Sequence, residues 1–440
     1  MLGSAAFRTA VAPGGVLAGP WVKNELWRRA RAVPSLDLRF ADNKTLTDAA
    51  SGQNLVTFTR ASSATFVGSD GLIKTATTDE PRFDHNPTTG ESLGLLVEEQ
   101  RTNLVLNSEQ FNDASWTKTN STITANTIVS PDGSTTGDSI TSNAGILGHV
   151  VQNVSQTTGT TYTLSTFAKA NQYTFCQLRI TGAVVGAITR AYFNLAAGTV
   201  TGAVNCTASI APVGNGWYRC SITYTTISTA TASPRIYGQV DASDTVGDGT
   251  SGIYIWGAQI EAGAFPTSYI PTTTATVTRS ADVASITGAN FSSWYRQDEG
   301  TMFADSVQAN VTPVSRIVAA SNNATSNRII LSRASASGGN INLTVTDAGI
   351  VQVSSVSLGT SIAAGTSNKV AAVYKAADFA GSVNGLTPVT QGTGTVPGVL
   401  TQLTIGCGEI LGGNPMTGTI KRFTFWPQRL PNSTLQAVTQ

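Results

Sequence analysis

The chain has 440 residues, of which 12% are charged and 40% are hydrophobic, and its formal net charge is +1. The apolar content excludes an intrinsically disordered chain, and the near-zero net charge excludes nucleic acid and acidic membranes as general electrostatic partners. No apolar run approaches the roughly 18 residues that a membrane-spanning helix needs, so we expect no membrane insertion.

Residues 1–34 differ from the rest of the chain and are predicted to form an N-terminal anchor segment. Residues 1–19 lack a basic start and a continuous apolar stretch, so we expect no secretory signal peptide. Residues 21–31 have the best helical pattern in the chain, although it is only partly amphipathic. This stretch indicates docking to another protein through Trp21, Leu26, Trp27, Arg28, Arg29 and Arg31. A helix packed on its own domain is the alternative, and the sequence leaves both open.

Residues 35–100 change to a period of two, which predicts β-strands. Leu36 and Leu38 alternate with polar residues, residues 68–71 indicate a hairpin turn, and residues 94–98 form a short expected strand. We interpret this segment as a small β module or a set of pairing strands that has no independent core.

Residues 101–275 show the pattern of a β-sandwich, in which short strands recur every ~8 to 12 residues between turn signals. The clearest expected strands are residues 161–168, 191–195, 217–224 and 252–261. The loops between them are rich in Gly, Asn, Asp and Ser. This segment is therefore predicted to be a jelly-roll domain.

A Thr-rich connection near residues 273–280 leads to a second predicted sandwich at residues 285–440. Its closing strand is expected at residues 418–427, and Asn432 or Ser433 fits the cap of a short terminal helix. The predicted fold class is all-β, with two antiparallel, lectin-like β-sandwich domains behind a short N-terminal anchor.

The chain has four cysteines and two histidines, and none of the cysteines belongs to a C-x-x-C pair. The usual zinc sites are therefore not expected, and the cysteines are interpreted as buried small hydrophobic side chains. Cys206 and Cys220 lie on segments that fit neighbouring strands, so a disulfide between them is left open.

Aromatic residues are the candidates for sugar binding, because pyranose rings present apolar C–H faces that pack on aromatic rings. The candidates are Trp116, Trp217, Tyr254, Trp256, Trp294 and Tyr295. Burial in a core is the simpler interpretation of these rings. Tyr254 and Trp256, for example, share one face of a strand whose other face is also apolar.

Three acidic residues in one loop, Asp241, Asp244 and Asp248, are the candidate ligands of a calcium ion. Their spacing differs from that of an EF-hand loop, and ordinary acidic turns are the alternative. No other cofactor is expected.

Catalytic motifs are missing from the sequence, which contains no G-x-S-x-G, H-E-x-x-H or P-loop pattern. A glycosidase needs two carboxylates that flank one bond, whereas the pairs at 79–80 and 98–99 are adjacent and point to opposite faces of a strand. We therefore expect a protein that is not an enzyme. Carboxylates that converge from distant loops are the alternative, and they would indicate a polysaccharide depolymerase.

Three stretches in the first quarter of the chain resemble a module that is common in bacteriophage head-spike and tail-fibre proteins. They are residues 58–66 (FTRASSATF), 79–84 (DEPRFD) and 94–104 (GLLVEEQRTNL). In that family the module is followed by Asn-Ser-Glu-x-Phe and then a tryptophan, which matches residues 107–111 and Trp116.

The domain after this module resembles the carbohydrate-binding jelly roll of the same proteins, through its closing residues 256–261 (WGAQIE) and 265–271 (FPTSYIP). The C-terminal domain is similar, more weakly, to concanavalin-like laminin-G sandwiches, through residues 369–374, 382–385 and 420–426. Residues 1–34 have no counterpart in this resemblance, as is typical of an adaptor to a particular virion.

The resemblance implies a structural component on the outer surface of a virion, namely a head spike, a tail fibre or a capsid decoration protein. Residues 1–34 would attach it to a capsid or tail protein, and the outward-facing sandwiches would meet host surface glycans. Such proteins are commonly homo-oligomers; a trimer is expected first, and a pentamer would fit a head vertex. One alternative is a tailspike-type depolymerase. The other is a bacterial adhesin, but the missing signal peptide argues against an adhesin. Head or tail location is left open.

Overall fold

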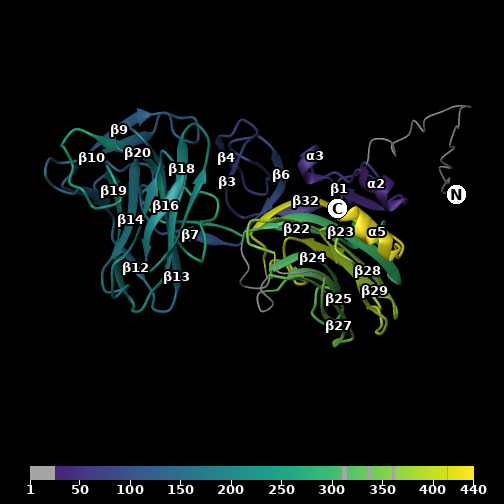
Figure 1. Ribbon diagram of the computed structural model, residues 1–440. Helices are drawn as coiled ribbons and strands as arrows, with labels where there is room; N and C mark the ends of the chain where they lie inside the picture. The colour runs from purple at the N-terminus through teal and green to yellow at the C-terminus, as the bar shows by residue number, and fades with distance from the viewer. Residues whose placement is uncertain (1–24, 310–314, 335–338, 359–361, 414) are drawn as a thin grey trace, which may run out of the picture.

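The computed structural model describes residues 25–309, 315–334, 339–358, 362–413 and 415–440. It confirms the all-β fold class, because antiparallel sheets pack face to face in two sandwiches. Figure 1 shows the teal jelly roll beside the green-to-yellow second sandwich, with purple N-terminal segments against the latter. Within the described residues, no helix is long and apolar enough to span a membrane.

The jelly roll consists of two sheets that enclose one core. The first has the order β17 (Thr207–Pro212), β18 (Trp217–Thr225), β13 (Thr161–Lys169), β20 (Gly252–Ala262), β10 (Gly137–Ser142) and β9 (Ser121–Ile128). The second has the order β16 (Thr199–Val204), β15 (Thr189–Asn194), β14 (Phe175–Thr181), β19 (Ala230–Gln239), β11 (His149–Val151) and β8 (Thr117–Thr119), and β12 (Val154–Gln156) also pairs with β19.

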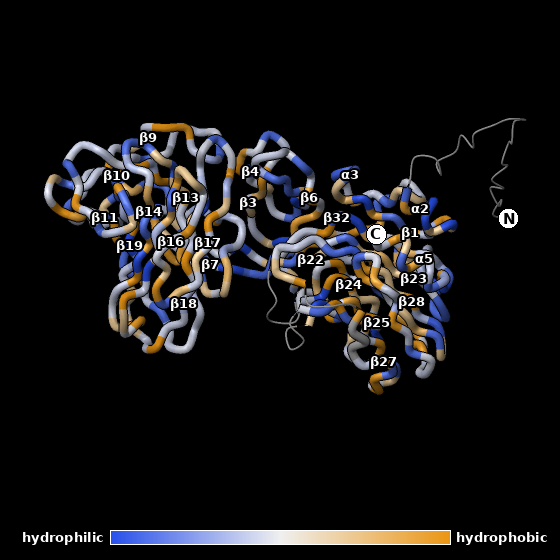
Figure 2. The backbone as a smooth tube through the Cα atoms, in the orientation of Figure 1, coloured by the Kyte–Doolittle hydropathy of each residue, from blue (hydrophilic) through white to orange (hydrophobic). Residues whose placement is uncertain are grey.

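Alternation along these strands builds the jelly-roll core. In β14, Cys176, Leu178 and Ile180 are buried between the sheets, whereas Gln177 and Arg179 lie on the opposite face. Figure 2 shows the same interleaving of hydrophilic and hydrophobic residues along the strands of this domain. The second sheet therefore presents a polar face away from the core.

The second sandwich also consists of two sheets. One has the order β30 (Val389–Gln391), β29 (Phe379–Val383), β28 (Ser367–Lys375), β23 (Glu299–Gln308), β32 (Gly418–Trp426), β6 (Ser92–Val97) and β5 (Arg82–His85), and β1 (Leu36–Leu38) pairs with β32. The other has the order β2 (Thr57–Thr59), β22 (Val283–Thr287), β31 (Gln402–Ile405), β24 (Ser315–Ser321), β25 (Arg328–Arg333), β26 (Ile341–Asp347) and β27 (Ile350–Ser357).

Residues 35–100 do not form a small β module of their own. They match the other interpretation, a set of strands that pair with another part of the chain, here residues 285–440. Strands β1, β5 and β6 extend one sheet of the second sandwich, and β2 extends the other. The side chains of Leu36, Leu38 and Leu95 are buried in the same core as those of the C-terminal strands. Residues 35–100 have too few apolar side chains for a core of their own, so they contribute to the core of the second sandwich.

The jelly roll is joined to the second sandwich by two segments that run side by side. The entering segment is β7 (Arg101–Asn103), and the leaving segment is β21 (Val277–Arg279), with which it pairs. A hairpin of β3 (Ala64–Val67) and β4 (Ile73–Ala76) lies nearby. The helices are short: α2 (Glu25–Ala30), α3 (Phe40–Asn43), α4 (Gly288–Ser292) and α5 (Asn432–Val438).

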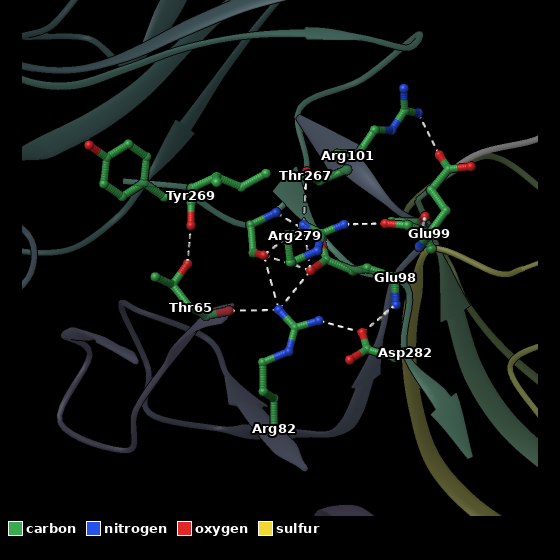
Figure 3. Close-up of polar contacts among 12 residues, drawn as sticks. Thr65, Arg82, Glu98, Glu99, Arg101, Thr267, Tyr269, Arg279 and Asp282 are labelled. Atoms are coloured by element: carbon green, nitrogen blue, oxygen red, sulfur yellow. Dashed lines mark hydrogen bonds and ion pairs between the residues drawn. The ribbon is translucent and has the colours of Figure 1, made fainter. Parts of the chain in front are cut away.

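A network of buried charges fixes the junction between the two sandwiches (Figure 3). Arg82 Nη1 donates to Glu98 Oε2 at 2.7 Å, and Asp282 accepts from both Arg82 and Arg60. Arg279 forms a further ion pair with Glu98 at 3.0 Å. Burial alone would raise the pKa of Glu98, but the charges of Arg279 and Arg82 outweigh it and lower that pKa to about 2.

Candidate functional site

The polar face of the second jelly-roll sheet carries the strongest candidate site, which we call the arginine face. Its side chains point away from the domain core, since their neighbours in sequence are the core residues. The arginine face is defined by His149, Gln177, Arg179, Arg190, Tyr192, Arg235, Tyr237 and Gln239.

The strand register arranges these side chains in rows across the sheet. Arg190, Arg179 and Arg235 are direct cross-strand partners on β15, β14 and β19. Residues paired in this way have Cβ atoms about 4.5–5.5 Å apart, and like charges directly opposite each other are destabilising. A row of three arginines therefore lowers the stability of the fold unless a negatively charged group nearby offsets the repulsion between them.

A second row runs parallel to the arginines. Gln177 on β14 pairs with Tyr192 on β15 and with Tyr237 on β19. The ring of His149 lies against the ring of Tyr237, with their centroids 4.7 Å apart. Burial, with the charges of Arg235 and Arg179, lowers the pKa of His149 to about 4, so the imidazole is neutral near pH 7.

One carboxylate, from Asp244, partly compensates the arginine row. Asp244 Oδ1 accepts from Tyr192 Oη at 2.6 Å and from Gln177 Nε2 at 2.7 Å. Its Oδ2 pairs with Arg190 at 2.5 Å and with Arg179 at 3.3 Å. Burial would raise the pKa of Asp244, but the hydrogen bonds from Tyr192 and Gln177 and the two arginines lower it.

The arginine face keeps hydrogen-bonding capacity that other groups of the protein do not use. Among the described residues, no carboxylate lies within ion-pair distance of Arg235, whose Nη1 is 3.5 Å from Tyr237 Oη. Buried polar atoms that have no partner in the described part of the chain gather here: Nε of Arg190 and Arg235, Oε1 of Gln177 and Gln239, and Nδ1 of His149. A buried polar atom without a partner costs about 1–3 kcal/mol, so a group of them favours a binding role.

A surface groove continues the arginine row at the edge of the sheet. Val151 pairs with Arg235 and with Thr117, so the three lie in one line across β19, β11 and β8. Val151 and Thr117 line a groove of about 580 Å³, together with Leu106 and Asn153. The groove therefore lies in line with the arginine row on the same face of the sheet.

The aromatic residues predicted to bind sugars lie mostly inside the protein. Five of the six side chains are at most 8% exposed, which is incompatible with stacking on a ligand: Trp116, Trp217, Trp256, Trp294 and Tyr295. The prediction is wrong for these five, because packing covers both faces of each strand or turn that carries them. Tyr254 is half-buried beside the cluster of Trp217 and Trp256, and its role stays a prediction.

Three of these buried rings have clear packing roles. The ring of Trp256 packs against that of Tyr269, with their centroids 4.7 Å apart, on the face of the first jelly-roll sheet that is turned away from the domain core. Trp294 and Tyr295 pack on Phe425 of β32, at centroid distances of 5.0 and 5.2 Å. These rings stabilise the sandwiches.

The three aspartates predicted to bind calcium do not converge. Asp244 faces the arginines, whereas Asp241 accepts from Ser243 and Thr245, and Asp248 accepts from Ser251. Within the described residues, no group of three or more His, Cys, Asp or Glu side chains could hold a metal ion. Asp241 and Asp248 instead accept from neighbouring loop residues, and Asp244 accepts from side chains of the sheet, so the calcium prediction at these residues is wrong. Cys206 and Cys220 are not bonded to each other, and all four cysteines are free thiols.

The helix predicted to dock the protein packs on the protein itself. Leu26 of α2 shares an apolar cluster with Leu435 and Val438 of α5, and Trp27 Nε1 donates to Asp37 at 2.9 Å. Leu26 and Trp27 are therefore buried and unavailable, which corrects the docking prediction for both. Arg29 pairs with Glu25 in the same helix, and Arg28 and Arg31 are exposed; Trp21 lies outside the described residues.

A cavity of about 330 Å³ at the junction is a second candidate, because Asp84 and Glu98 both line it. Burial raises the pKa of Asp84 to about 6, opposite to the shift of Glu98, and such divergence is typical of acid–base pairs. However, Glu98 accepts hydrogen bonds at both oxygens from Ser268 and also from Arg82. We therefore assign Glu98 to the junction and not to substrate.

The sequence reasoning missed the arginine face, although a signal was present. Arg190-Ala-Tyr192 and Arg235-Ile-Tyr237 repeat an Arg-x-Tyr pattern, and Gln177-Leu-Arg179 has the same spacing. In each case the middle residue is apolar and buried, so the flanking pair must share the outer face of a strand. That these strands are neighbours in register was not visible in the sequence.

No protein-family model and no curated protein matches the sequence. Among solved structures, the CBM40 domain of Ruminococcus gnavus IT-sialidase bound to alpha2,3 sialyllactose is 15% identical, with a TM-score of 0.29, over 33% of this chain and 84% of that chain. Domain 4 of AbnA, a GH43 extracellular arabinanase from Geobacillus stearothermophilus in complex with arabinotriose, is 13% identical, with a TM-score of 0.29, over 41% and 84%. A heptameric SAP-like pentraxin from Limulus polyphemus is 19% identical, with a TM-score of 0.26, over 32% and 70%.

Proposed function

We propose that this protein is a non-enzymatic saccharide-binding component on the outer surface of a bacteriophage particle, and that the arginine face is its binding surface. The observation that carries the binding role is the gathering of three arginines, two amides and two tyrosines on one sheet face, with unused donors and acceptors among them. Planar groups of this kind bind the paired hydroxyls of sugars.

Hydrogen bonding and charge, more than ring stacking, would dominate this recognition. The guanidinium of Arg190 lies 5.1 Å from the ring centroid of Tyr192, and that of Arg179 lies 5.8 Å from that of Tyr237. Both tyrosine rings are therefore covered by arginines and are only 2% exposed. What the face offers to a ligand is the partly exposed edges of its guanidinium groups, because the amides of Gln177 and Gln239 are buried.

The phage setting rests on the sequence resemblance of residues 35–275, and attachment to the particle is part of the proposal. Because α2 packs on its own domain, attachment falls mainly to residues 1–24, which lie outside the described residues. Electron cryo-microscopy of the intact particle tests this part. Density for the protein on the capsid or at the tail supports it, and absence from the particle overturns it.

A glycan array with the purified full chain tests the binding part. We expect binding that Arg179→Gln weakens by roughly tenfold or more, because a charge-assisted hydrogen bond contributes about 1.5–3 kcal/mol. Arg296→Gln is the matched control, since Arg296 is an exposed arginine of the second sandwich. Absence of binding under every ion condition would overturn saccharide recognition. Release of reducing ends from a bound glycan would overturn the non-enzymatic assignment.

A further inference from the structure

We propose that the ligand of the arginine face is an acidic saccharide, and that Asp244 holds the position of its carboxylate until the ligand displaces it. This inference rests on the proposed function and adds the ligand class and a built-in competitor. Its first support is charge. Three arginines share the face with one carboxylate, and no described residue places a carboxylate within ion-pair distance of Arg235.

The second support is the way in which Asp244 is held. Its carboxylate accepts from side chains of three strands: Arg190 and Tyr192 on β15, Gln177 and Arg179 on β14, and Gln239 on β19. Such convergence of donors on one carboxylate is the arrangement expected of an anion site. The side chains of Asp244 and Arg190 are 29% and 24% exposed, so a carboxylate from solvent can contact Arg190 first. Gln177 and Tyr192 are buried, so it reaches them only once Asp244 has moved.

The third support is the weak attachment of the loop that carries Asp244. Ala242, Ser243, Thr245 and Val246 are all exposed, and Val246 is 52% exposed despite being apolar. Ser243 and Thr245 hydrogen-bond to Asp241 within the same loop. Residues 242–246 are therefore tethered to the sheet mainly through the Asp244 carboxylate, and lifting them exposes little buried apolar surface.

The fourth support is what the displacement would leave for a ligand. Gln177 is fully buried and Gln239 is 1% exposed, and the Oε1 atoms of both lack a partner in the described part of the chain. The Nε atoms of Arg190 and Arg235 are also unpartnered there. A saccharide carboxylate would take the guanidinium edges, and its hydroxyls would donate to the amide oxygens.

The experiment compares acidic and neutral saccharides on the full chain by calorimetric titration. The probes are oligogalacturonate against its carboxyl-reduced form, and sialyllactose against lactose; the two pairs distinguish uronic from sialic acids as the source of the carboxylate. We expect wild type to prefer the acidic member of at least one pair. Asp244→Asn removes the competing charge, and it should tighten acidic binding by roughly tenfold without changing neutral binding.

Asp241→Asn is the control, because Asp241 lies in the same loop but accepts hydrogen bonds from Ser243 and Thr245 alone among the described residues. It should leave both affinities unchanged. Hydrogen exchange of the wild-type protein provides a test that needs no variant. Saturation with the acidic probe should speed exchange in residues 242–246 and slow it in β14 and β15. Slower or unchanged exchange in the loop would overturn displacement.

The outcomes separate this inference from the proposed function. If neutral and acidic probes bind equally, and Arg179→Gln weakens both while Asp244→Asn alters neither, the acidic class and the competitor role are wrong but saccharide binding stands. If neither wild type nor Asp244→Asn binds any probe, and the glycan array is also empty, both fail.

Discussion

At the scale of the residue, His149 gives the arginine face a measurable pH dependence. Its imidazole is 7% exposed and faces Arg179, Arg235 and the ring of Tyr237. The pKa of His149 is lowered from 6.5 to about 4 in the folded protein, so the unfolded chain takes up the proton first as the pH falls. The free energy of unfolding should therefore decrease between about pH 6.5 and pH 4.

Urea unfolding at pH 7 and pH 5 checks this expectation. Wild type should lose more stability between the two pH values than His149→Gln, which has no proton to take up at this position. All other titrating groups are shared by the two proteins, so their contributions cancel in the comparison. An equal loss in both proteins would contradict the low pKa of His149.

Single residues also show where sequence reasoning reaches its limit. Tryptophans were predicted to bind sugars because their rings can stack on pyranose faces. Rings of this size stabilise a fold most when they are buried, and Trp116, Trp217 and Trp256 are buried. Arg179 and Arg235 were not predicted as site residues, because each is the only charged residue of its own strand. Only the register, which pairs Arg179 with Arg235 across 56 residues of sequence, makes them neighbours in a row.

At the scale of the element, Gly94 explains why a motif strand of the N-terminal segment can join the second sandwich. In β6 its φ is 91°, and an added Cβ would meet the Ile420 carbonyl oxygen of β32 at 2.2 Å. Gly94→Ala should therefore destabilise the protein by more than about 1 kcal/mol. The backbone conformation is strained for any residue with a Cβ, and the added Cβ would clash with the Ile420 carbonyl oxygen. Thermal unfolding measures the effect.

Two glycines serve as controls for that variant. Gly52 has a φ of 77° and no atom within 4 Å of an added Cβ, so Gly52→Ala isolates the cost of backbone strain. Gly398 has open space around it and no such φ, so Gly398→Ala should change stability by less than about 0.5 kcal/mol. A Gly94→Ala protein as stable as Gly52→Ala would show that the close approach of β6 and β32 is not needed.

The elements themselves were largely predictable, because runs rich in β-branched and aromatic residues stand between clear turn signals. Expected strands at 161–168, 217–224 and 252–261 correspond to β13, β18 and β20. The pairing of β1 and β6 with β32 was not predictable, because it depends on which distant strand offers an open edge. β32 is more than 300 residues away from both.

At the scale of the whole molecule, the jelly roll is an insertion into the second sandwich. Residues 36–97 and 283–426 supply that sandwich, and β7 and β21 carry the chain out to the jelly roll and back. A connection of two short strands is weak by itself, so the orientation of the arginine face depends on the buried charges at the junction. These charges explain why the motif segments are rich in arginine and acidic residues: Arg60, Arg82, Glu98 and Glu99 belong to them.

Glu98→Gln tests this dependence. The substitution leaves the guanidinium groups of Arg82 and Arg279 buried with one carboxylate fewer, and removing one partner of a buried ion pair costs about 3–5 kcal/mol. Because the pKa of Glu98 is lowered from 4.5 to about 2, its contribution to stability is present above pH 4.5 and is lost as the pH falls toward 2. The variant should therefore be less stable at pH 7 and less sensitive to acid.

Scanning calorimetry distinguishes an effect on the junction from a general loss of stability. If the junction couples the two sandwiches, wild type unfolds in one transition, whereas Glu98→Gln shows separate transitions for the jelly roll and the second sandwich. Glu91→Gln is the matched control, since the Glu91 side chain is 62% exposed in its pair with Lys421 and solvent screens such a pair. A single transition in Glu98→Gln, lowered no more than in Glu91→Gln, would mean that β7, β21 and the surrounding contacts hold the domains together without the buried charges.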